Sequence, residues 1–185
     1  AGYATRLYPL TKDTPKPLLQ IGPKPMVEHI IDSLKKVKQL NEIIVVTNDK
    51  FYSTFIEWAN TFDSDIPVKI LNDGTTTNDN RLGAVGDIAF TINAEDIKEG
   101  MIIVAGDNLF TFNLAKMEEF FNEKEGSVLA LYDLGDPELL ANKFGVVEID
   151  HRNNKVTGFE EKPDKPKTSL TATACYFLTA IDVQE

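Results

Sequence analysis

Hydrophobic positions along the first two-thirds of the chain follow two periods in turn, and this alternation predicts an α/β fold. Apolar residues recur at helical spacing over 26–37, with charged residues on the opposite face, which predicts an amphipathic helix. Further helices are expected over 51–62, 82–90 and 114–122. Strands are expected over 42–47, 68–71, 101–105 and 127–132, of which 42–47 and 101–105 are continuous apolar runs typical of strands buried on both faces.

From Gly145 onward, strands follow one another without helices. The segments 145–150 and 155–159, joined by a turn at 151–154, predict a β-hairpin, and a last strand is expected over 173–178. Strands that alternate with helices and then give way to strands alone predict one domain. Its expected architecture is a Rossmann-like, mostly parallel sheet flanked by helices, with a β-rich second half.

Composition narrows the possible partners and metal sites. The net charge of -10 over 185 residues argues against a nucleic-acid surface, which needs a basic face. Cys175 is the only cysteine and His29 and His151 the only histidines, so an internal disulfide, a thiolate zinc site and a His-rich metal site are excluded. The sequence has no signal peptide and no apolar run near the roughly 20 residues that span a bilayer. We therefore expect a cytoplasmic protein without a membrane partner.

The first stretch combines small residues with positive charge. Gly2, Ala4 and Thr5 leave backbone N–H groups uncovered, so an anion can approach the main chain. Arg6 offers a planar fork of donors that suits phosphate oxygens, and Lys16 adds a second cation. The alternative interpretation is a solvated loop with scattered charge.

Asp107 follows the predicted strand 101–105 within a Gly-Asp-Asn sequence. Ligands of open α/β sheets bind at the carboxyl ends of the strands, where a carboxylate can hold Mg²⁺ against a triphosphate. Alternatively, Asp107 caps the helix that begins near Asn113. Local position does not decide between these two roles.

A polar loop over 72–81 precedes Gly83 at the start of a predicted helix. A glycine at a helix start allows a flat ring to lie on the backbone, and Asn72 and Asp73 are candidates for contacting the edge of a nucleotide base. The alternative is that Gly83 and Gly86 only permit close packing of the helix on the sheet.

Glu161 and Lys162 form a candidate receptor for a sugar phosphate. The carboxylate can accept hydrogen bonds from ring hydroxyls, while the ammonium neutralises phosphate. The same residues also fit a solvated surface turn.

Several motifs, taken in order, resemble those of the sugar-1-phosphate nucleotidyltransferases, in particular the glucose-1-phosphate thymidylyltransferase and uridylyltransferase type. They are G-Y-A-T-R-L-Y-P-L-T followed by Pro15-Lys16, then L-G-A at Gly83, G-D-N at Asp107, F-G-V-V at Gly145, and E-E-K-P. Two positions depart from the family pattern: Ala4 and Ala174 stand where it has glycine. The resemblance implies a glycosyltransferase-A-like fold.

The resemblance also implies a reaction, in which a nucleoside triphosphate and a sugar 1-phosphate give a nucleotide sugar and pyrophosphate. It assigns Arg6 to the triphosphate and leaving pyrophosphate, Lys16 to the transferring phosphate, and Asp107 to Mg²⁺. The implied nucleotide-binding residues are Gly2, Ala4, Thr5, Asn72, Asp73 and Gly83, and the implied sugar-phosphate residues are Gly145, Glu161, Lys162 and Thr173.

Other functions stay open at this point. The acceptor could be a non-sugar phosphate such as phosphocholine, or the chain could be a non-catalytic regulatory paralogue that binds a nucleotide sugar. A third alternative is an α/β binding module unrelated to the family. Relatives in the family suggest a homo-oligomer.

The family carries a hydrophobic strand directly before the glycine-rich loop and a further segment after the region of Glu185. We therefore expect that this sequence lacks the first strand and a C-terminal segment, the latter with a second metal-binding aspartate. The missing strand should lie between the strands at Ile43 and Ile102, supplied by upstream residues or by another chain.

Overall fold

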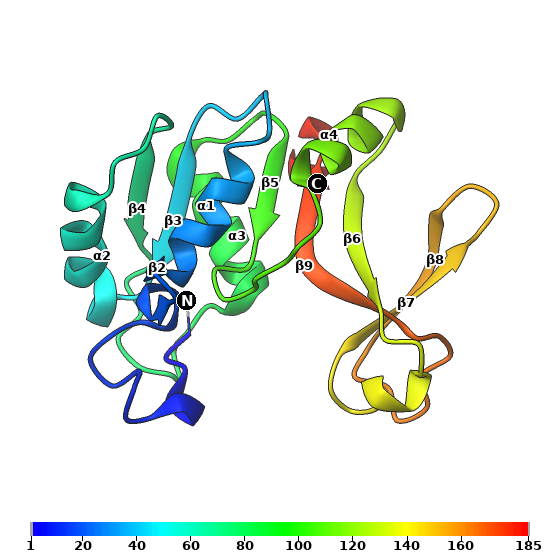
Figure 1. The fold of residues 1–185 in the computed structure, drawn as a ribbon, viewed down its shortest axis with the longest axis horizontal. Helices are drawn as coiled ribbons and strands as arrows, with labels where there is room; N and C mark the ends of the chain where they lie inside the picture. Colours follow the sequence, from blue (N-terminus) through cyan, green and yellow to red (C-terminus); the bar gives the residue numbers. More distant parts are fainter. Residues whose placement is uncertain (1, 185) are drawn as a thin grey trace.

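The computed structural model describes residues 2–184 and contains two regions that differ in architecture. We call residues 2–123 the α/β half and residues 128–178 the β half. In Figure 1, α1 to α3 and β3 to β5 of the α/β half lie on the left, and β6 to β8 lie on the right; β9 runs between these two groups, and α4 lies above, beside β6.

The predicted helices are all present, with changed ends. α1 ends before Val37, which is nevertheless buried, and α3 continues past Phe90 until Asp96 takes a left-handed backbone conformation with φ 49°. The helices are α1 (Met26–Leu34), α2 (Asp49–Thr61), α3 (Gly83–Glu95), α4 (Leu114–Glu123) and α5 (Ala180–Gln184), with 3-10 helices η1 (Thr5–Leu7), η2 (Lys16–Leu18) and η3 (Pro137–Leu140).

The predicted strands are also present, and two of them are longer than expected. The second strand of the hairpin extends to Glu161, and the last strand begins at Leu170. The strands are β1 (Gln20–Ile21), β2 (Lys24–Pro25), β3 (Ile43–Thr47), β4 (Val68–Asn72), β5 (Met101–Val104), β6 (Val128–Asp133), β7 (Gly145–Asp150), β8 (Lys155–Glu161) and β9 (Leu170–Leu178).

The pairing of the strands confirms the α/β fold with a β-rich second half and corrects one detail. Within residues 2–184 only β3 and β4 form a parallel pair. β5 runs in the same direction as these strands (Figure 1), but its hydrogen-bonded neighbour is the antiparallel β9, which also pairs with β6 and β7. The parallel part of the fold is therefore limited to β3 and β4, and the strands that pair with β9 are all antiparallel to it.

β3 and β5 do not pair with each other. In the described part of the chain, β3 pairs with β4 alone and β5 with β9 alone, in separate sheets. The expectation of a further strand between them stays a prediction.

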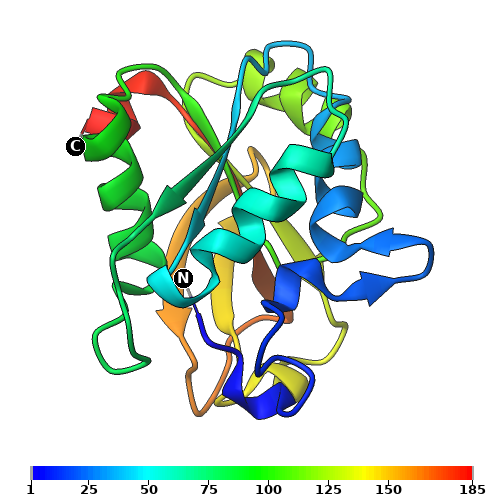
Figure 2. The same cartoon turned by 90° about the vertical axis from the view of Figure 1, so that its left-hand side faces the viewer.

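The main hydrophobic core lies in the α/β half and extends to β9. α2 contributes Phe51, Phe55 and Trp58, as its spacing predicts, and each fully buried side chain of this kind contributes about 1.5–3 kcal/mol. The Trp58 indole also donates a hydrogen bond to Glu28 of α1 at 2.9 Å, which joins the two helices that lie side by side in Figure 2. No helix within residues 2–184 is long and apolar enough to span a membrane.

Candidate active site

Residues 2–11, which we call the glycine-rich loop after the matching motif of the resembled family, fold tightly around the carbonyl of Ala4. The fully buried Thr11 donates its hydroxyl to this oxygen at 2.8 Å, and the backbone N–H of Leu7 donates to it at 2.9 Å. Ala4 has φ 46°, in the left-handed region, which costs a residue with a Cβ about 1–2 kcal/mol. Ala4 is therefore strained at a position where the resembled family has glycine.

The same loop presents its candidate phosphate-binding groups to solvent. Gly2, Thr5 and Arg6 are exposed, and a Cβ at Gly2 would meet nothing within 4 Å. Within residues 2–184 the Arg6 guanidinium has no ion-pair partner. Its donors are accordingly available to an anion.

Tyr3, to which sequence reasoning gave no role, fixes this loop in place. Its ring is 6% exposed and packs near Phe51, and its hydroxyl donates to the Thr75 carbonyl at 3.2 Å. Burial raises the pKa of Tyr3, so the hydroxyl remains a donor. The glycine-rich loop is thereby joined to the 72–81 loop. An aromatic residue between Gly2 and Ala4 was the signal that could have revealed this anchor.

Lys16 and Asp107 meet, although 91 residues separate them in the sequence. Lys16 Nζ lies 2.8 Å from Asp107 Oδ2, and the two side chains are 31% and 49% exposed. Pro17 of η2 packs against Gly106, with its Cγ 3.5 Å from the point that a Cβ would occupy. The structure therefore brings together the candidate phosphate lysine and the candidate metal ligand.

The Asp107 turn is held by β9. The backbone N–H of Ala105 donates to the Ala174 carbonyl at 3.0 Å, and the Asn108 side chain donates to the Thr173 carbonyl. These bonds place Asp107 at the carboxyl end of β5, where the sequence predicted it. Asn113, not Asp107, caps α4 by accepting a hydrogen bond from Ala115, so the capping alternative for Asp107 is wrong.

β9 contains a bulge at the residues that hold this turn. The β6–β9 register passes from the pair Leu129–Tyr176 to the pair Leu131–Ala172, so β9 contains extra residues opposite Ala130. Ala174 has φ 51°, and the Thr173 hydroxyl donates to the Ala130 carbonyl at 2.8 Å. The expected sugar contact of Thr173 would thus use only the remaining acceptor capacity of its hydroxyl.

Asn72 and Asp73 lie at the carboxyl end of β4 and shape the loop that follows. Asn72 donates to Asp49 at 2.8 Å and accepts from the Gly74 N–H at 2.9 Å. The Asp73 carboxylate accepts from the backbone N–H and hydroxyl of Thr75 at 2.7 and 2.6 Å. Burial would raise the pKa of Asp73, but hydrogen bonds from Thr75 outweigh it and the pKa is lowered. Both side chains act on the turn, and a contact with a base stays a prediction.

Gly83 begins α3 with φ 76°, and a Cβ there would meet nothing within 4 Å. Glycine is required by the backbone conformation rather than by close packing, so the packing alternative is wrong for Gly83. At Gly86 a Cβ would lie 2.8 Å from the Cβ of Leu82, so the contact there is local to the helix start. The open space at Gly83 is compatible with an approaching ring.

In the β half, Phe159 and Glu161 converge on Gly145. A Cβ at Gly145 would lie 2.7 Å from Phe159 Cζ and 3.1 Å from Glu161 Oε2. The Phe159 ring therefore covers the glycine, yet it is 57% exposed. The Gly145 carbonyl accepts the Thr171 hydroxyl at 2.9 Å. Glycine at this position has a structural cause in Phe159, beside its expected contact with a sugar.

Lys162 follows β8 with φ 48°, and its backbone N–H donates to the Phe144 carbonyl at 3.1 Å. Its ammonium bonds the neighbouring Glu161 carboxylate, and both side chains are more than half exposed. Burial, and then the negative charge of Glu161, raise the pKa of Tyr176 on β9. Sequence reasoning missed Tyr176, although it alternates with the buried Cys175 and Phe177 and so faces the other side of the sheet.

Asp107 fits one kind of metal site. Residues 2–184 contain no group of three or more His, Cys, Asp or Glu side chains able to hold a metal ion. Mg²⁺ is commonly held by one or two carboxylates together with substrate phosphates, so a single exposed aspartate beside a lysine matches that type.

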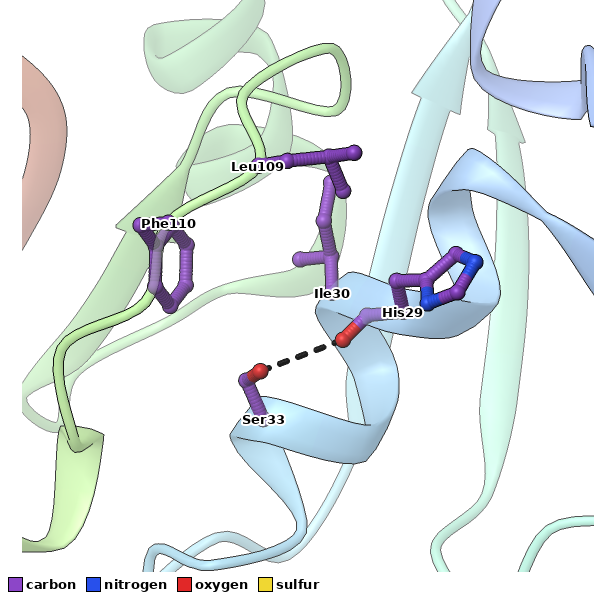
Figure 3. A pocket seen from close by; sticks show the side chains of 5 residues that line it. All are labelled: His29, Ile30, Ser33, Leu109 and Phe110. Atoms are coloured by element: carbon purple, nitrogen blue, oxygen red, sulfur yellow. Dashed lines mark hydrogen bonds between the residues drawn. The ribbon is translucent and has the colours of Figure 1, made fainter. Parts of the chain in front are cut away.

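Neither of two cavities in the molecule is lined by the predicted site residues. A cavity of about 210 Å³ lies between α1 and the chain that follows the Asp107 turn, beside Ile30 and Phe110 (Figure 3). In this view the Ser33 hydroxyl donates to the His29 carbonyl, while the His29 ring points away from Phe110. A cavity of about 440 Å³ adjoins Val37, Ile102 and Phe177. Arg6, Asp107, Glu161 and Lys162 are instead exposed, and Lys16 is partly exposed.

The chain is similar to known proteins over most of its length. The chain is 30% identical to the glucose-1-phosphate thymidylyltransferase of Neisseria gonorrhoeae over 186 residues, which cover 95% of this chain and 58% of that protein. It is 28% identical to mannose-1-phosphate guanylyltransferase 1 of Arabidopsis thaliana over 164 residues, 88% of this chain and 43% of that protein. The chain thus spans about half the length of these curated relatives.

A similar solved structure is that of a Bacillus anthracis protein described as a glucose-1-phosphate thymidylyltransferase in complex with sucrose. The TM-score is 0.78 at 28% identity, and the match covers 99% of this chain and 70% of that one. A family model described as "Nucleotidyl transferase" matches residues 1–182. The chain belongs to the nucleotidyl transferase family.

Proposed function

We propose that this chain carries the catalytic region of a sugar-1-phosphate nucleotidyltransferase. The enzyme transfers a nucleotidyl group from a nucleoside triphosphate to a sugar 1-phosphate and releases pyrophosphate. The observation that carries this proposal is the contact of Lys16 with Asp107, because it unites a cation and a carboxylate at the carboxyl end of β5, where ligands of α/β sheets bind.

The reaction requires positioning and positive charge rather than a protein nucleophile. An oxygen of the sugar phosphate attacks the α-phosphorus of the triphosphate in line, and pyrophosphate leaves on the opposite side. The two substrates are both polyanions, so their mutual repulsion must be offset. Mg²⁺, when bound at Asp107, supplies positive charge to the phosphate oxygens.

Each cation has a separate place in this scheme. The exposed Arg6 binds the triphosphate and the leaving pyrophosphate, and Lys16 contacts the transferring phosphate. In the β half, Lys162 neutralises the sugar phosphate while the Glu161 carboxylate accepts hydrogen bonds from sugar hydroxyls. The exposure of Glu161 and Lys162 supports this assignment, because both can reach a ligand without a change in the backbone.

Pyrophosphate release tests the proposal and identifies the substrates. The protein is assayed with Mg²⁺ against the common nucleoside triphosphates and a panel of sugar 1-phosphates, with phosphocholine as the non-sugar acceptor. Release should require both substrates and be lost in Asp107→Ala, whereas Asp63→Ala, which changes an exposed aspartate after α2, should behave like the wild type. No release with any pair from folded protein would overturn the proposal.

A second candidate is a non-catalytic paralogue that binds a nucleotide sugar. Ala4 and Ala174 favour this candidate, since both have a positive φ where the resembled family has glycine. Backbone strain at these positions opposes tight contact with the phosphates. Nucleotide-sugar binding without pyrophosphate release would support this candidate over the enzyme.

A further inference from the structure

Lys16 and Asp107 contact each other, although the proposed reaction requires each to contact something else. The ammonium is needed at a phosphate and the carboxylate at a metal ion, yet Nζ lies 2.8 Å from Oδ2. Both side chains are partly exposed, so ions and water can reach the pair. Any cation that binds Asp107 must compete with the lysine.

We propose that Lys16 keeps divalent cations off Asp107 until a polyphosphate draws the lysine away. This inference rests on the proposed function. An ammonium in direct contact occupies one carboxylate oxygen and cancels its charge, so an approaching cation meets a neutral pair. Since residues 2–184 offer no cluster of three or more potential metal ligands, Asp107 has no ready-made set of side-chain ligands to help it displace the lysine.

The local backbone limits this exchange to one side chain. Pro15 and Pro17 flank Lys16 and restrict φ, and Pro17 packs against Gly106 of the Asp107 turn. The Lys16 side chain, in contrast, is a flexible chain of four carbons that carries the ammonium. The ammonium can therefore move from carboxylate to phosphate while η2 and the Asp107 turn stay in place.

The exchange couples the two ligands. A triphosphate carries more negative charge than one carboxylate, so it attracts Lys16 and exposes Asp107 when a cation is needed. By linkage, a cation at Asp107 releases Lys16 for phosphate and strengthens triphosphate binding by the same factor. Lys16 is thus also the residue that sets the order in which metal and nucleotide bind.

Binding of Mn²⁺ alone, followed by electron paramagnetic resonance without nucleotide, tests the proposal. Lys16→Gln should bind Mn²⁺ about two- to fivefold more tightly than the wild type at low ionic strength, with a smaller difference in salt. Lys16→Arg keeps the charge and should match the wild type, as should Lys36→Gln, which removes an exposed charge from the turn after α1. Asp107→Asn should lose the site.

A second readout follows the lysine itself. With ¹³C-methylated lysines, the Lys16 signal in the wild type should shift when inorganic tripolyphosphate is added, and in Asp107→Asn it should already be shifted without ligand. Wild-type Mn²⁺ affinity in Lys16→Gln would overturn the exchange and leave the proposed reaction intact. The proposed reaction itself fails only if no substrate pair releases pyrophosphate.

Discussion

The two halves of the molecule hold their charged site residues in different ways. In the α/β half, Lys16 and Asp107 come from elements 91 residues apart and meet only because the chain is folded. In the β half, Glu161 and Lys162 are neighbours in sequence and bond each other locally. The first pair depends on the tertiary structure, whereas the second depends on where β8 ends.

Packing differs in the same direction. The main core cluster includes α1, α2 and part of β9, while the buried Leu140, Val146 and Val147 of the β half lie outside it. Most of β8 is exposed, so its position depends on backbone pairing with β7 and on the contact of Phe159 with Gly145. The α/β half is therefore held mainly by side-chain packing, whereas β8 is held mainly by backbone pairing.

The largest contrast is expected in catalysis. Lys16→Ala should lower kcat about a hundredfold, because it removes positive charge that acts on the transferring phosphate in the transition state. Lys162→Ala should instead raise KM for the sugar 1-phosphate about tenfold, a loss of about 1.4 kcal/mol in binding. Steady-state kinetics separate the two effects, with Lys36→Ala as the charge control. Equal effects on kcat and KM in both variants would contradict the division of roles.

Two glycine substitutions sharpen the packing contrast. Gly145→Ala should lower the free energy of unfolding by about 1 kcal/mol, because its methyl meets the Phe159 ring. Gly106→Ala should change it little, since Pro17 lies at an ordinary contact distance of 3.5 Å. Urea denaturation measures both. Phe159→Leu should remove most of the penalty at Gly145, and an undiminished penalty in the double variant would refute the assigned cause.

β9, which serves both halves, has a pH-dependent contribution to stability. Burial raises the pKa of the Cys175 thiol to about 11, above its ordinary value. The unfolded chain therefore loses this proton first as pH rises, so the contribution is complete below about pH 8.5 and is lost progressively towards pH 11. The decline should reach about 1 kcal/mol by pH 10. Denaturation of the wild type and Cys175→Ala across this range measures it, and parallel pH profiles would disprove it.

The smallest effects concern the strained alanines, one in the glycine-rich loop and one in the β9 bulge. Ala4→Gly and Ala174→Gly should each raise the free energy of unfolding by about 0.5–1 kcal/mol, since relief of the positive φ exceeds the entropic cost of glycine. Thermal unfolding is the measurement. Ala89→Gly, in the exposed interior of α3, should have the opposite sign. Destabilisation by all three would show that no strain is present.

Sequence patterns predicted the elements but not the contacts between them. The spacing of Phe51, Phe55 and Trp58 predicted α2 from local periodicity. The apolar run of β5 predicted a strand that ends just before Asp107, and the rule that ligands bind at strand carboxyl ends made Asp107 a candidate. The Lys16–Asp107 ion pair and the hydrogen bond from Tyr3 to Thr75 join segments far apart in sequence, and no local pattern encodes them. The β9 bulge was missed for a related reason: its residues have ordinary strand character, and the partner strand determines the irregular register.

The β9 bulge also determines the length of the segment between Thr171 and Ala174. Thr171 pairs with Val146 of β7, and Ala174 accepts the hydrogen bond that holds the Asp107 turn, so one short segment separates β7 from the turn that carries the proposed metal ligand. A strand advances about 3.3 Å per residue, and each residue added or removed also reverses the faces of those beyond it. In the proposed site, the distance between the sugar-binding and metal-binding sides therefore depends on the number of residues in this segment as well as on their identity. Insertions of two residues, which preserve the faces, are the means by which such a site could be enlarged.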